Sequence, residues 1–133
     1  MTAKEITGES MKNNLMIIGG IFHLGVAVFH LFFWRLFHWK KDLASLTFIN
    51  RAVMQILNLC LTFVFIAVAF ISLFYSTELV TTNLGLVICV LISIFWFLRV
   101  VEQIFFFGLK KRSSVILTIL CIAGFVIYLM PVL

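Results

Sequence analysis

Four long apolar runs dominate this 133-residue sequence and restrict its fold more than any other feature. A bilayer core about 30 Å thick is crossed by roughly 20 helical residues. Because each run reaches that length, we predict membrane-spanning helices at residues 15–37, 52–75, 83–108 and 114–133. The connections between them are short, so successive helices should pack as antiparallel neighbours. The runs lack the alternation typical of membrane β-barrel strands.

The composition agrees with a membrane protein. Hydrophobic residues make up 64% of the chain, whereas about half of a soluble domain is apolar. We therefore predict an all-α integral membrane protein in which residues 15–133 form a four-helix transmembrane bundle behind a polar tail at residues 1–14. The net charge of +5 does not indicate nucleic-acid binding, because the basic residues gather in two short loops.

The distribution of charge predicts the orientation. The first predicted loop carries Lys40 and Lys41, and the third carries the basic run 110–112, whereas the middle loop has only the charge of Glu78. Loops with excess Lys and Arg stay in the cytoplasm. Both of these basic loops should therefore be cytoplasmic, which places the N-terminus and the C-terminus outside.

Each predicted helix carries a stripe of small or polar residues. Positions three, four or seven apart lie on one face of a helix. The stripes are Gly20, His23, Ala27, His30 and Trp34; Arg51, Gln55, Asn58, Thr62 and Ala69; Cys89, Ser93, Trp96, Arg99 and Gln103; and Ser114, Thr118, Cys121, Phe125 and Tyr128. Small residues let helices approach closely and polar residues form hydrogen bonds between them. The stripes should therefore face inward.

Counting along straight helices brings six polar residues to one level, roughly 7–13 Å inside the cytoplasmic boundary. The predicted ligand-binding site consists of His30, Gln55, Asn58, Arg99, Glu102 and Gln103. A second polar contact, between His23 and Tyr128, is predicted deeper in the membrane, at roughly 20 Å.

Two interpretations remain open for these residues. Arg99 and Glu102 are three residues apart, so they are predicted either to neutralise each other or to bind an anion and carry a proton. The histidines are predicted either to join helices by hydrogen bonds or to take part in proton transfer or ligand binding. No metal site is predicted, because His30 and Glu102 are too small a ligand set, and no cofactor is indicated.

Three functions are compatible with this pattern. The first is a membrane protein whose cytoplasm-facing polar pocket binds a small ligand or ion in transport or sensing. The second is an accessory or assembly subunit of a larger membrane complex, or a homo-oligomer, in which the polar layer only joins helices. The third is a membrane enzyme acting on lipid or quinone, with His30 as acid or base.

The stretch 22–58, with HLGVAVFHLFFWRLFHW and NRAVMQILN, resembles small bacterial four-helix membrane proteins. This resemblance implies a location in the bacterial inner membrane.

Overall fold

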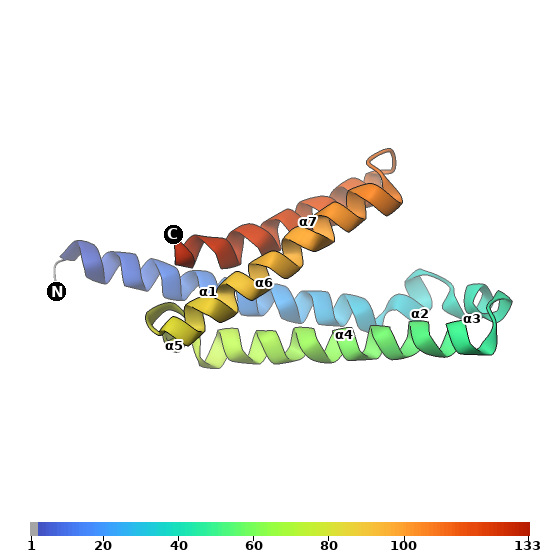
Figure 1. Cartoon of the computed structure of the whole chain (residues 1–133), viewed down its shortest axis with the longest axis horizontal. Helices are drawn as coiled ribbons and strands as arrows, with labels where there is room; N and C mark the ends of the chain where they lie inside the picture. Colours follow the sequence, from blue (N-terminus) through green and yellow to red (C-terminus); the bar gives the residue numbers. More distant parts are fainter. Residues whose placement is uncertain (1–2) are drawn as a thin grey trace. The chain divides into compact units, whose positions relative to one another are not determined.

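The structure is a computed structural model that describes residues 3–133, and the side chains of residues 7–133. Residues 1 and 2 of the predicted tail lie outside the described residues. The four long helices are α1 (Ala3–Leu31), α4 (Phe48–Phe74), α6 (Asn83–Glu102) and α7 (Arg112–Leu129) (Figure 1). The short elements are α2 (Phe33–Leu36), α3 (Trp39–Asp42), η1 (Leu43–Ser45), α5 (Ser76–Thr81), η2 (Gln103–Phe107) and η3 (Met130–Val132).

Within residues 3–133, four helical stretches are long and apolar enough to cross a membrane. They are Thr7–Leu31, Phe48–Phe74, Asn83–Phe107 and Arg112–Val132. Each overlaps one predicted span, so the prediction of four apolar helices able to span a bilayer is confirmed.

The chain divides into two compact units. One joins the residues up to Gly19 with Ser72–Leu133, and the other is Gly20–Ile71. In the second unit, a ring contact joins His23 to Phe65 and a hydrogen bond joins His30 to Asn58. Residue numbers thus fall along α4 as they rise along α1, so the two helices form an antiparallel pair.

The first unit contains the antiparallel pair of α6 and α7. The Ser93 hydroxyl donates a hydrogen bond to the Phe125 carbonyl at 3.4 Å, and Gln103 Nε2 donates one to Ser114 Oγ at 3.1 Å. Between these points the indole of Trp96 lies directly against Gly124. The absence of a side chain on Gly124 lets the two helices approach closely, as is common between helices in membranes.

The distribution of side chains is the reverse of that in a soluble helical protein. The buried residues of α7 are Ser114, Thr118, Cys121, Gly124 and Tyr128. Four of them belong to the stripe expected to face inward, whereas Gly124 is buried in place of Phe125, which is half-buried. Large apolar side chains point outward instead; Phe63 on α4, for example, is 71% exposed. Water would penalise so large an exposed apolar surface, whereas lipid does not.

The first helix differs from its predicted bounds of 15–37. Its C-terminal end comes earlier because the chain turns at Phe32 and forms the separate helix α2. His38 then adopts the left-handed conformation, with φ 47°, before α3. The apolar run continues through this turn, so composition alone did not reveal it.

At the other end, α1 continues through the polar segment down to Ala3. Lys12 Nζ donates a hydrogen bond of 2.8 Å to the carbonyl of Pro131, which holds this segment against the end of the last helix. The second long helix, α4, begins at Phe48 rather than at the predicted residue 52. Thr47 caps its first turn, because Thr47 Oγ1 accepts a hydrogen bond from the backbone N–H of Asn50 at 3.4 Å.

Candidate functional site

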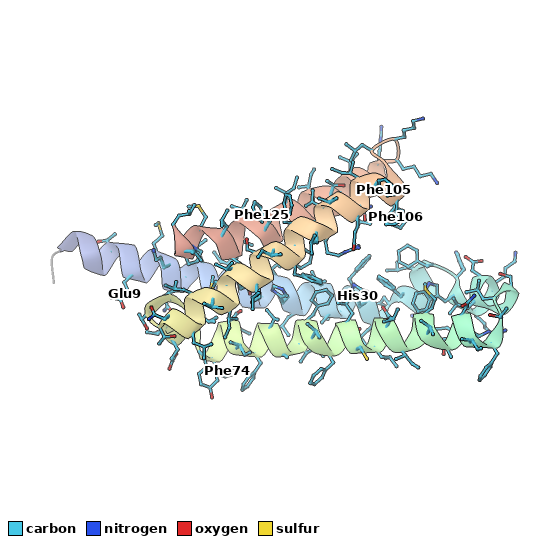
Figure 2. The ribbon with its side chains drawn as sticks, in the orientation of Figure 1. Glu9, His30, Phe74, Phe105, Phe106 and Phe125 are labelled. Carbon is cyan, nitrogen blue, oxygen red and sulfur yellow. The ribbon has the colours of Figure 1, made fainter. Side chains whose placement is uncertain are left out.

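His30 and Asn58 form a reciprocal pair in the second unit. His30 Nδ1 lies 2.9 Å from Asn58 Oδ1, and Asn58 Nδ2 donates to the backbone carbonyl of His30 at 3.2 Å (Figure 2). Asn58 is only 8% exposed, and His30 is half-buried. The last turn of α1 is therefore attached to α4 through both polar groups of one amide side chain.

This geometry fixes the proton on the histidine ring. A backbone carbonyl can only accept, so the Nδ2 side of the Asn58 amide must face it, which turns Oδ1 toward the ring. Because Oδ1 also only accepts, His30 Nδ1 must be the donor. In a neutral imidazole the other nitrogen, Nε2, then carries the lone pair. Asn58 thus orients His30 as a potential base or hydrogen-bond acceptor.

Aromatic rings surround the His30 imidazole. Phe33 stacks on it with a centroid distance of 4.3 Å and an interplanar angle of 23°, and Phe65 lies at 5.1 Å. Phe33, the first residue of α2, follows the turn at Phe32 and lies three residues after His30. Gln55 lies one turn from Asn58 on α4 and is half-buried. The pair thus has apolar walls and two polar neighbours on the same helix, Gln55 and Thr62, whose hydroxyl donates to the Asn58 carbonyl at 2.7 Å.

Arg99 and Glu102 form an ion pair on α6, in the first unit. Arg99 Nη1 and Glu102 Oε2 are 2.6 Å apart, and the two side chains are 37% and 50% exposed. The predicted pairing of these residues is confirmed. Both lie within the apolar stretch Asn83–Phe107, where mutual neutralisation reduces the cost of placing charge near lipid.

Gln103 follows the ion pair and is 2% exposed. Its Nε2 donates to Ser114 Oγ, and the Ser114 hydroxyl donates to the Gly108 carbonyl. The three residues therefore form a chain of hydrogen bonds across the turn between α6 and α7. A buried amide left without partners would be costly, so this contact explains how Gln103 is accommodated.

The six predicted site residues fall into two groups. His30, Gln55 and Asn58 belong to the second unit, whereas Arg99, Glu102 and Gln103 belong to the first. Their convergence on one ligand stays a prediction. The predicted depth of His30 also stays a prediction; it was counted along a straight helix to residue 37, whereas α1 ends at Leu31. His30 thus lies in the last turn of its helix rather than two turns inside it.

Tyr128 is fully buried in the first unit. Its hydroxyl lies 2.6 Å from that of Ser72, and its ring lies against Gly19 of α1. His23, 1% exposed, belongs to the second unit, and its predicted contact with Tyr128 stays a prediction. Sequence reasoning missed Ser72, although it continues the α4 stripe three residues beyond Ala69. It also missed Phe33 and Phe65, which periodicity could not distinguish from other apolar residues.

Within the described residues 3–133, no three His, Cys, Asp or Glu side chains are grouped so that they could hold a metal ion. No known protein family, curated protein or solved structure matches the chain. The residues and their geometry are therefore the only basis for inferring a function.

Proposed function

We propose that this protein is a four-span membrane protein that binds a small ligand or ion on its cytoplasmic side, in transport or sensing. The proposed site contains His30, Gln55, Asn58, Arg99, Glu102 and Gln103. In this proposal both termini face outward and the membrane is a bacterial inner membrane. The exposed lysines of the first loop and the exposed bases of the third loop support that orientation.

The observation that carries the proposal is the orientation of His30 by Asn58. A histidine whose Nδ1 is held by an oxygen acceptor offers Nε2 as a base, an acceptor or a metal ligand. Asn58 Oδ1 is that acceptor, 2.9 Å from His30 Nδ1, and stacking on Phe33 fixes the plane of the imidazole ring.

The other residues have complementary roles in the proposed site. Arg99 holds an anionic group and Glu102 balances the charge. The amides of Gln55 and Gln103 orient a polar ligand. Because Arg99 and Glu102 are already paired at 2.6 Å, an anionic ligand would have to exchange with the carboxylate of Glu102. Binding should therefore be stronger in the Glu102→Gln variant if Arg99 contacts an anion.

The test is native mass spectrometry of the protein extracted gently from its own membrane, with bound species released and identified. A stoichiometric small molecule should be present, and His30→Phe should abolish its retention. His38→Asn is the matched control, since His38 is exposed and its left-handed backbone conformation suits asparagine. Absence of any bound small molecule, or its retention in His30→Phe, would contradict the proposal.

A second candidate function is that of an accessory subunit. It is favoured by hydrogen bonds that join buried polar side chains of the protein to one another: Ser72 bonds with Tyr128, and Gln103 bonds with Ser114. These contacts stabilise helix packing without a ligand. The same extraction distinguishes the candidates, because an accessory subunit should co-purify with a defined partner polypeptide in constant stoichiometry.

A further inference from the structure

The turn between α6 and α7, residues 103–112, combines two exposed triplets of opposite character. Phe105, Phe106 and Phe107 are 80%, 74% and 67% exposed. Gly108 then reverses the chain, with φ 63°, and the exposed bases Lys110, Lys111 and Arg112 follow. Figure 2 shows Phe105 and Phe106 at the end of α6 beside this turn. The turn thus has an aromatic part and a cationic part, separated only by Gly108 and Leu109.

The length of the turn holds both triplets at the membrane boundary. The apolar stretches on either side end at Phe107 and begin again at Arg112. Only four residues connect them, so the bases cannot move away from the lipid headgroups by more than a few residues' reach. The three bases therefore stay within about one Debye length, roughly 8–10 Å, of the headgroups. At that range salt does not fully screen the attraction between the bases and anionic lipids.

The cations of the α6–α7 turn are not neutralised by the protein. The sequence from 103 to 133 contains no Asp or Glu, and Glu102 is already paired with Arg99. Among the described side chains, none of the three bases has an ion-pair or hydrogen-bond partner. The first loop differs, because Asp42 directly follows Lys40 and Lys41. Charge complementarity therefore favours an anionic partner at the α6–α7 turn above all.

We propose that the α6–α7 turn is a binding site for an anionic phospholipid. Lys110, Lys111 and Arg112 contact the headgroup phosphate, and the acyl chains pack against Phe105, Phe106 and Phe107. Each base near a membrane surface contributes about 1 kcal/mol to the attraction for anionic lipid. This corresponds to roughly a fivefold preference for anionic over neutral lipid for each base. This lipid site uses none of the six residues proposed for the ligand site, although Gln103 begins the same turn, and either proposal can fail without the other.

The test uses the full chain in nanodiscs containing equal amounts of phosphatidylglycerol and phosphatidylcholine with identical acyl chains. Native mass spectrometry then counts the lipids retained after release. The wild-type protein should retain phosphatidylglycerol at least several-fold over phosphatidylcholine. Lys110→Gln, Lys111→Gln and Arg112→Gln together should remove this preference. The matched control is Lys40→Gln with Lys41→Gln, which should leave it nearly unchanged.

Several outcomes would overturn the proposal. They are equal retention of the two lipids by the wild-type chain, an unchanged preference in the triple variant, or an equal loss in the matched control. Excess soluble glycerol phosphate should not displace the lipid, because it offers no acyl chains to the phenylalanines; full displacement would also overturn it. If the triple variant does not fold, Lys111→Gln alone should lower the preference roughly fivefold, and no change would contradict the proposal.

Discussion

Asn58 shows how much one polar side chain contributes to a helix pair. It bonds both the ring and the backbone carbonyl of His30. We expect Asn58→Leu to lower the free energy of unfolding in mixed micelles by about 1 kcal/mol, the usual scale for hydrogen bonds between membrane helices. Asn50→Leu, at an exposed position of the same helix, should change it little.

A double-mutant cycle isolates the pair. His30→Phe and Asn58→Leu should together cost less than the sum of the two single changes, because either one already removes the contact. Strictly additive effects would contradict the pairing.

The ion pair of Arg99 and Glu102 should contribute modestly, since its side chains are 37% and 50% exposed. Partial exposure screens the attraction, so we expect Glu102→Gln to cost less than about 1 kcal/mol. Arg99→Gln should cost a similar amount, and the double change should be no worse than either. The measurement is thermal unfolding in detergent, and unchanged melting of both single variants would show that the pair does not stabilise the fold.

At the scale of the element, two glycines of the first unit lie directly against aromatic side chains of a neighbouring helix. A Cβ on Gly124 would lie 2.6 Å from Cδ2 of Trp96, and one on Gly19 would lie 2.7 Å from the hydroxyl of Tyr128. Because both aromatic side chains are buried, neither can move aside freely. We expect Gly124→Ala and Gly19→Ala each to destabilise the protein by about 1–3 kcal/mol, measured by unfolding in mixed micelles.

Gly25 is the matched control within α1. Nothing lies within 4 Å of a Cβ built at that position, so Gly25→Ala should gain helix propensity, up to about 1 kcal/mol. Equal destabilisation by all three alanines would show that contact with Trp96 and Tyr128 is not the cause.

At the scale of the whole molecule, the orientation of the chain is the first prediction to test. The basic loops should be cytoplasmic, since positive loops are retained inside. A reporter enzyme that is active only outside the cytoplasm should therefore be active when fused after Leu133. The same reporter fused after Lys111, in the basic α6–α7 turn, should be inactive. The reverse pattern would invert the topology and move the proposed ligand site to the outer side.

The sequence by itself determined the number of apolar helices and which face of each is largely buried, although Trp34 of the first stripe is 46% exposed. Both follow from local properties: hydropathy over about 20 residues, and the 3.6-residue period that places Ser114, Thr118 and Cys121 on one face. The pairing of Arg99 with Glu102 was predictable for the same reason, because three residues along one helix fix the distance.

Only the tertiary structure decided where α1 ends and which polar groups meet. The turn at Phe32 lies among the apolar residues 31–34, which give no signal for a helix end, and it forms where Phe33 can stack on His30. The bond between Ser72 and Tyr128 joins residues 56 apart in sequence. Such partners depend on how helices are placed in space, and a periodic pattern shows which face is buried without showing what covers it.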